Sequence, residues 1–149
     1  MKIIVFKGVI RLEFTVEKSN AISVILSASQ SIQEVIRKDA VENELNPTEF
    51  AVLKLLYHKG EQPIQVIGKM IHISSSSITY VVDKLEQKKI VIRKACSEDR
   101  RVIYASLTNA GKTLMDQILP HHEICMDKIF CQLTQSDLNK MIELLKKIE

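Results

Sequence analysis

The order of short elements between residues 46 and 108 is the feature that most constrains the fold of this chain. Apolar residues at helical spacing indicate three helices in succession. The helices are followed by two β-branched runs, VIRKAC and VIYASL, which flank the charged loop SEDRR and predict a β-hairpin. We therefore expect a helical unit that carries a small hairpin at one edge.

Local start and stop signals divide these helices. Pro47 lies at or near the first turn of the first helix, and Gly60 stops it. Pro63 opens the second helix, which should end near His72, and Ser74 is a good N-cap for the third. The tight connection between the second and third helices predicts a helix-turn-helix. The apolar stripe that should turn the third helix toward the core is Ile78, Val81, Val82 and Leu85.

A helix-turn-helix followed by a charged hairpin predicts a winged helix. Its second helix can enter the major groove of B-DNA, which is about 12 Å wide. The candidate DNA contacts on this helix and on the first wing strand are Ser75, Ser76, Ser77, Thr79, Tyr80, Lys84 and Arg93. The alternative is that the serines only cap a helix and solvate a surface, which we prefer for Ser74 alone.

The loop between the two β-branched runs places acids beside arginines. An arginine that enters a narrow minor groove loses up to about 2 kcal/mol of side-chain entropy. Asp99 can accept hydrogen bonds from the guanidinium two residues later and hold Arg101 extended, with Arg100 as a further DNA-contact candidate. The alternative is an ordinary surface salt bridge worth about 0–1 kcal/mol.

Charge is distributed unevenly along the chain, whose net charge is +3. Residues 46–108 hold ten basic and six acidic side chains, whereas residues 1–45 are balanced and residues 109–149 have one acid in excess. The positive excess therefore lies in the predicted winged helix, which indicates a polyanionic partner.

The remaining sequence suits a single domain over residues 1–149, with the winged helix-turn-helix at about 46–108. Helical flanks at about 18–45 and 108–149 carry more apolar surface than so small a core can cover, so we expect them to form a dimerisation region. The stripe Leu138, Met141, Leu145 and Ile148 of the last helix is part of that surface. The predicted fold is mainly α with a small β-hairpin wing, flanked by N- and C-terminal dimerisation helices.

Three local expectations concern the flanks. Alternating residues from Ile10 to Val16 favour a strand in the first sixteen residues. Thr108 should cap a long helix that is kinked or broken near Pro120. Thr134 should cap the last helix.

Residues 46–111 resemble the MarR (multiple antibiotic resistance regulator) family. The matching stretches are LNPTEFAVLKLL, SSSSITYVVDKLEQKKIVIRK and EDRRVIYASLTNAG. The wing pattern of that family, Asp-x-Arg followed by Leu-Thr-x-x-Gly, is met by Asp99, Arg101, Leu107, Thr108 and Gly111. Two positions depart from the family: Lys89 stands where glycine is usual, and Tyr80 where arginine is frequent.

The resemblance implies a cytoplasmic homodimer that binds a pseudo-palindromic operator in double-stranded DNA. It implies transcriptional control, usually repression, relieved by a small aromatic, phenolic or quinone-like compound, by thiol modification or, less often, by metal. The alternatives from other classes are a winged helix used for protein contact without DNA binding, and a metal-responsive regulator.

Catalytic and cofactor chemistry finds little support in the sequence. No nucleophile–base set or phosphate-binding glycine loop is present, so we expect no enzyme and no cofactor. His121 and Cys125 share a helical face, but the sequence offers no further ligand, so no metal is expected and both His121 and His122 should face solvent.

No apolar run is long enough to span a membrane. Three cysteines without a CxxC motif suit reduced thiols and remain possible redox sensors: Cys96, Cys125 and Cys131.

Overall fold

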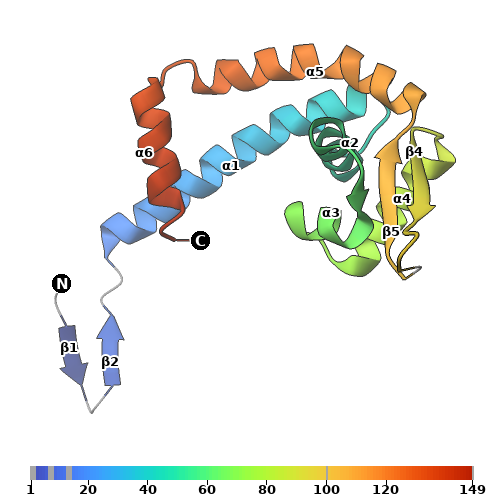
Figure 1. The fold of residues 1–149 in the computed structure, drawn as a ribbon. Coiled ribbons are helices and arrows are strands. Elements are labelled where there is room, and N and C mark those ends of the chain that lie inside the picture. The colour runs from blue at the N-terminus through green and yellow to red at the C-terminus, as the bar shows by residue number, and fades with distance from the viewer. Residues whose placement is uncertain (1–2, 7–8, 13–14, 100, 149) are drawn as a thin grey trace. The chain divides into compact units, whose positions relative to one another are not determined.

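The first of two compact units, Met1–Glu34, holds an antiparallel hairpin and the beginning of a long helix (Figure 1). The computed structural model describes residues 3–6, 9–12, 15–99 and 101–148. Strands β1 (Ile3–Phe6) and β2 (Val9–Leu12) pair with Ile3 opposite Leu12. The strand expected from Ile10 to Val16 is confirmed as far as Leu12, where it forms one half of a two-stranded hairpin. Phe14 lies outside the described residues, and Val16 is the first residue of a helix instead.

Helix α1 (Val16–Glu42) corresponds to the helical flank predicted at about residues 18–45. Its last turns belong to the second unit, Val35–Glu149, where Asp39 and Ala40 are buried. In the first unit, large apolar side chains of α1 remain exposed: Ile22, Val24, Ile25 and Leu26.

The second unit carries the predicted winged helix. Three of its strands form an antiparallel sheet in the order β3-β5-β4. The elements, in chain order, are α2 (Pro47–Lys59), β3 (Gln62–Pro63), α3 (Ile64–Met70), α4 (Ser75–Gln87), β4 (Val91–Ala95), β5 (Ile103–Leu107), α5 (Asn109–Phe130) and α6 (Gln135–Leu145). The mainly α fold class is confirmed, with the short strand β3 as an unpredicted third member of the wing sheet.

Helix starts follow the predicted capping residues. The side-chain oxygens of Ser74, Thr108 and Thr134 each accept a hydrogen bond from a backbone N–H in the first turn of α4, α5 and α6, respectively. Asn46 caps α2 in the same way, and Glu49 completes a capping box by accepting from the Asn46 backbone. These contacts satisfy N–H groups that a helix leaves without intrahelical partners.

The core of the second unit lies between α2, α3, α4, the wing sheet and the first half of α5. The predicted apolar stripe of α4 is buried in it as expected. The largest fully buried apolar side chains are Phe50, Leu53, Ile67, Ile78, Leu85 and Met115. This core fixes the face that α4 turns away from the protein.

Helix α5 continues through Pro120, so of the two expected outcomes, a kink or a break, the break is wrong. Pro120 itself is exposed, so solvent can reach the carbonyl group that its ring leaves without a helical partner. Buried residues on both sides, Ile118, Leu119 and His122, hold the two halves of the helix against the core. None of the described helices is long and apolar enough to cross a membrane.

Candidate nucleic-acid interface

The turn between α3 and α4 sets the approach of the two helices. His72 adopts a left-handed conformation with φ of 57°, and the Ile73 backbone N–H donates to the Gly68 carbonyl at 2.9 Å. A Cβ added to Gly68 would lie 3.0 Å from Cγ2 of Ile78, so the absence of a side chain lets α3 pack closely on α4. The predicted helix-turn-helix is therefore present, with α4 as its second helix.

The outward face of α4 carries the predicted contact residues. All six are exposed: Ser75, Ser76, Ser77, Thr79, Tyr80 and Lys84. Ser74 Oγ lies 3.1 Å from Ser76 Oγ and 2.8 Å from Ser77 Oγ, so the cap organises a cluster of hydroxyls at the N-terminus of α4. Anions bind favourably at such an end, because backbone N–H groups and the helix dipole point toward them.

Two further side chains of α4 lie beside one another. The Lys84 Nζ atom is 5.5 Å from the centroid of the Tyr80 ring, within the range of a cation–π contact. The Tyr80 side chain is exposed, with 61% of its surface accessible. An aromatic ring and an ammonium group are thus presented together, and the ring of Tyr80 stands at the position where arginine is frequent in the family.

Arg93 on β4 has a different environment from the other candidates. Its guanidinium forms ion pairs with Asp83 and Glu86 of α4, and its Nη2 donates to the Thr79 carbonyl at 3.0 Å. Its Nε is the one buried side-chain nitrogen or oxygen in the described part of the chain that lacks a hydrogen-bond partner. These contacts tie the wing to α4, so Arg93 orients the two elements relative to each other.

Asp99 holds Arg101 at the tip of the wing, as the loop sequence predicted. The Arg101 Nε donates to Asp99 Oδ1 at 3.1 Å, Nη2 donates to Oδ2 at 3.3 Å, and the backbone N–H of Arg101 donates to Oδ1 at 3.0 Å. The Arg101 side chain is nevertheless 92% exposed. The hydrogen bonds from the Arg101 side chain, and then its backbone, lower the pKa of Asp99. Arg100 lies outside the described residues.

The structure brings several of these groups to one concave surface. Thr79, Arg93 and Arg101 line a hollow between α3, α4 and the wing, together with Pro63 and Val66. Most of its lining is apolar, and Arg93 and Arg101 are the charged residues in it. Thr79 on α4 and Arg101 of the wing therefore line the same hollow.

The end of α4 is fixed by two lysines with different roles. Lys89 has a left-handed backbone with a φ of 60°, at the position where glycine is usual in the family. The Lys88 Nζ forms a 3.0 Å ion pair with the buried carboxylate of Glu49 and donates to the Glu44 carbonyl at 2.8 Å. The C-terminus of α4 is thereby attached to the start of α2.

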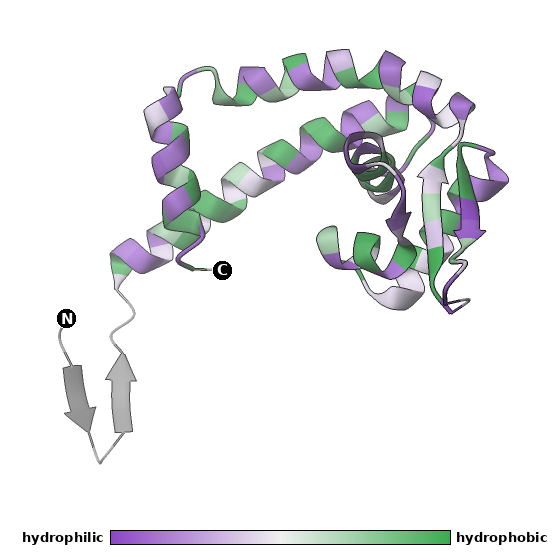
Figure 2. Ribbon diagram, in the orientation of Figure 1, coloured by the Kyte–Doolittle hydropathy of each residue, from purple (hydrophilic) through white to green (hydrophobic). Residues whose placement is uncertain are grey.

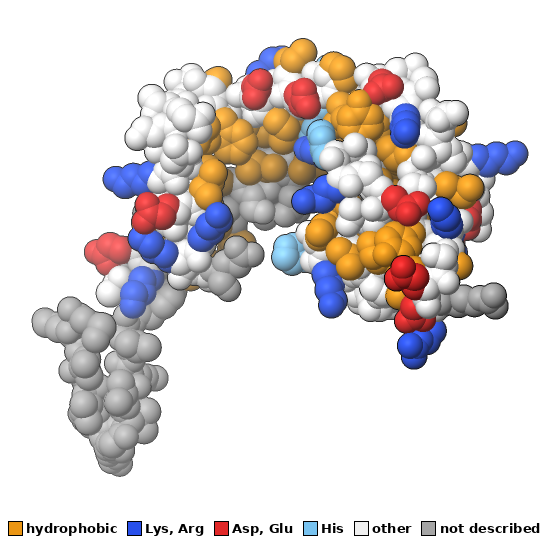
Figure 3. Space-filling view, in the orientation of Figure 1, with side chains coloured by type: hydrophobic (Ala, Val, Ile, Leu, Met, Phe, Trp, Pro, Cys, Tyr) orange, Lys and Arg blue, Asp and Glu red, His pale blue; other side chains and the backbone are white. Residues whose placement is uncertain are grey.

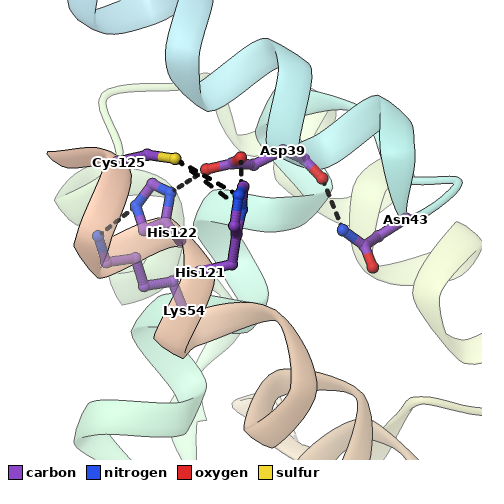
Figure 4. Close-up of polar contacts among 6 residues, drawn as sticks. All are labelled: Asp39, Asn43, Lys54, His121, His122 and Cys125. Carbon is purple, nitrogen blue, oxygen red and sulfur yellow. Dashed lines mark hydrogen bonds and ion pairs between the residues drawn. The ribbon is translucent and has the colours of Figure 1, made fainter.

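Sequence reasoning missed a buried polar cluster between the end of α1 and α5 (Figure 4). His122 is 1% exposed, which corrects the expectation that it faces solvent, whereas the side chain of His121 is 66% exposed as expected. His122 Nδ1 lies 2.7 Å from Asp39 Oδ2, and its Nε2 lies 3.0 Å from Lys54 Nζ. No local signal predicted this pairing, because Asp39 and His122 are 83 positions apart.

The three cysteines are free thiols in different surroundings. Cys96 and Cys125 are partly buried, and Cys131 is exposed. The Cys125 Sγ lies 3.7 Å from Nε2 of His121, one helical turn earlier. The thiols thus differ both in access to solvent and in their polar neighbours.

Comparison with known proteins places this geometry among DNA-binding regulators. The model of the MarR family matches residues 45–103. The HTH-type transcriptional regulator MhqR of Bacillus subtilis is 47% identical over 133 residues, covering 89% of this chain and 92% of its own. Two solved Streptomyces coelicolor structures share the fold. AbsC, a MarR family transcriptional regulator, has a TM-score of 0.85 at 23% identity over 93% of this chain and 95% of its own. Sco3205, another member, was solved in complex with DNA; it has a TM-score of 0.85 at 18% identity over 93% of this chain and 89% of its own.

Proposed function

This chain belongs to the MarR family of DNA-binding transcriptional regulators, and from that premise we propose that it is a repressor that binds a pseudo-palindromic operator as a homodimer. The family consists of regulators and not of enzymes. We expect the protein to act in the cytoplasm, on double-stranded DNA.

The single observation that carries the proposal is the exposed but oriented guanidinium of Arg101. A side chain that is 92% exposed and held by two hydrogen bonds to Asp99 has a defined direction before any partner binds. Preorganisation of this kind lowers the entropy cost of entering a narrow minor groove. We assign the minor-groove contact to Arg101 and a positioning role to Asp99, with Arg100 as a phosphate contact beside it.

The exposed face of α4 supplies the major-groove contacts in this proposal. The hydroxyl cluster that Ser74 organises with Ser76 and Ser77, together with the neighbouring exposed Ser75, suits phosphates. Thr79, Tyr80 and Lys84 lie further along the helix and suit base edges. Arg93 acts by holding the wing against α4, because its guanidinium is occupied by Asp83 and Glu86.

The homodimer is supported by apolar surface that one chain leaves open. None of the residues of α6, all of which the structure describes, is buried. Hydrophobic and hydrophilic residues alternate along α5 and α6 (Figure 2), and hydrophobic side chains reach the surface among charged ones (Figure 3). The exposed apolar side chains of α6 and the segment after it are Ile142, Leu144, Leu145 and Ile148. A second copy of the chain would cover them, as exposed apolar patches of this kind commonly mark interfaces.

The proposed function also includes a signal that releases the protein from DNA. We propose a small aromatic, phenolic or quinone-like effector, with thiol modification of Cys96, Cys125 or Cys131 as the competing route. Only the second route requires a cysteine, so a variant without cysteines distinguishes the two.

Sequencing the genomic fragments that the purified protein retains tests the proposed function. We expect a shared pseudo-palindromic site, bound with an affinity that falls steeply as salt concentration rises, because phosphate contacts release counterions. Fragments without a common site, bound with little salt dependence, would instead indicate a winged helix that contacts proteins.

A further inference from the structure

Three side chains with metal-binding atoms meet in a hollow between the end of α1 and the middle of α5. They are Asp39, His121 and Cys125, and one ligand atom from each lies within 4.8 Å of the others. Asp39 Oδ1 is 3.5 Å from His121 Nδ1, and Cys125 Sγ is 3.9 Å from the same nitrogen. Figure 4 shows the three side chains converging from the two helices. Ligands of one tetrahedral zinc ion lie roughly 3.3–3.8 Å apart, given bond lengths of about 2.0–2.3 Å. Small side-chain rotations therefore suffice to reach ligation distance.

The hydrogen bonds behind Asp39 leave one of its oxygens directed at this hollow. Its Oδ2 lies 2.7 Å from Nδ1 of the buried His122, and Nε2 of that ring lies 3.0 Å from Lys54 Nζ. Because an ammonium group only donates, Nε2 accepts, and Nδ1 carries the proton that it donates to Asp39. The Asp39 side chain is only 4% exposed, so this chain of contacts fixes its orientation. Metal ligands are commonly held in place by such outer hydrogen bonds.

The chemistry of the three ligands selects the ion. A thiolate and an imidazole favour zinc over magnesium or calcium, which prefer oxygen ligands alone. Two anionic ligands, from Asp39 and Cys125, balance the charge of one Zn²⁺ ion. Other charged residues around the hollow offset one another in part: Lys38, Glu42 and Lys128 line it as well. His121 and Cys125 are one helical turn apart, a spacing that lets two side chains chelate one ion.

We propose that this cluster is a zinc site, with Asp39, His121 and Cys125 as protein ligands and water in the fourth position. Sequence reasoning found the pair on α5 but not the third ligand, because Asp39 lies on another helix. The bound ion would attach the last turns of α1 to α5. This proposal is independent of DNA binding, since none of the three residues belongs to the proposed DNA interface.

Titration of the full-length, metal-free protein with Co²⁺ tests the site, because cobalt reports both geometry and thiolate ligation by absorption. We expect one tetrahedral Co²⁺ per chain with a thiolate-to-cobalt charge-transfer band, displaced by one equivalent of Zn²⁺. Cys125→Ser should abolish the band, whereas Cys131→Ser, which changes an exposed thiol near the end of the same helix, should retain it. His121→Ala should lower the affinity by more than about tenfold, and His58→Ala on α2 should not.

Thermal unfolding gives a second readout that does not depend on cobalt. Zn²⁺ should raise the melting temperature of the wild type and of Cys131→Ser but not of Cys125→Ser, because a ligand that binds only the folded state stabilises it. Both substitutions affect side chains that are partly or fully exposed, so the variants should fold without metal, which circular dichroism checks. A wild type without a saturable cobalt band, or a band that disappears in Cys131→Ser and persists in Cys125→Ser, would overturn the proposal.

Discussion

Gly111 lies directly against the backbone carbonyl of Ile90, where α5 begins beside the start of the wing. A Cβ at this position would stand 2.1 Å from the Ile90 oxygen. The same carbonyl accepts the Thr108 backbone N–H at 3.1 Å, and Thr108 Oγ1 donates to the Lys89 carbonyl at 2.9 Å. The Leu-Thr-x-x-Gly pattern therefore describes a joint between the wing and α5, in which threonine supplies the hydrogen bonds and glycine the space.

Gly111→Ala should destabilise the protein by about 1–3 kcal/mol, because backbone must shift to remove the overlap. The higher helix propensity of alanine, about 1 kcal/mol, offsets only part of this loss. Urea denaturation measures the difference, with Thr113→Ala at an exposed position of the same helix as the control. A variant as stable as the wild type would show that the contact between Gly111 and the Ile90 carbonyl can relax without cost.

Lys89→Gly should leave stability unchanged or raise it by up to about 1 kcal/mol, because lysine is strained at a φ of 60°. The neighbouring substitution Lys88→Gly is the matched control, and it should lower the stability. Lys88 has an ordinary right-handed backbone and pairs with the buried Glu49, so its loss should cost about 1–3 kcal/mol. Denaturant midpoints measure the stability of both variants. A clear loss of stability in Lys89→Gly would show that lysine is not strained at this position.

Sedimentation at micromolar concentration should show a species of twice the 17.0 kDa chain mass. Leu145→Lys should shift it toward the monomer, because a charge would be buried in the proposed interface. Asn139→Lys, an exposed polar position of the same helix, should remain dimeric. A wild type that sediments only as a monomer would remove the dimer from the proposal.

A variant with serine at Cys96, Cys125 and Cys131 should still be released from DNA by phenolic compounds, because a reversible aromatic ligand needs no thiol. Fluorescence anisotropy with a labelled operator measures this release for variant and wild type side by side. If only the wild type responds, the effector acts through a cysteine, and single substitutions then identify which one.

Local signals predicted most of the winged helix. Caps at Ser74, Thr108 and Thr134 and the stop at Gly60 depend on near neighbours in sequence, and each is present. Pro120 does not break α5, because packing on both sides of it outweighs a local penalty of about 3 kcal/mol. The propensity rule describes a helix alone, and α5 is held against a core.

Contacts between distant segments were beyond sequence reasoning. The partners of His122 lie 83 and 68 positions away, so nothing near it in the sequence indicated burial. The ion pairs of Arg93 with α4 were equally invisible, although the wing strand itself was predicted. Asp99 and Arg101 are the exception in the candidate site, because a two-residue separation in a loop fixes their contact locally.

We expect Arg101 to enter the minor groove of the DNA and Asp99 to act on binding through Arg101. Arg101→Ala should weaken operator binding by about 1–3 kcal/mol and reduce the salt dependence by about one phosphate contact. Asp99→Ala should also weaken binding in the wild type, because the guanidinium loses its orientation. In the Arg101→Ala background the same change should have little effect or tighten binding, since only the repulsion between Asp99 and DNA is removed.

A double-mutant cycle of Asp99 and Arg101, with operator affinity as the readout, measures how far the two residues act together. We expect a substantial coupling energy between the two substitutions, with Asp99→Ala weakening binding only when Arg101 is present. Additive effects, or tighter binding by Asp99→Ala alone, would contradict this expectation and leave the acids of the wing as ordinary surface charge.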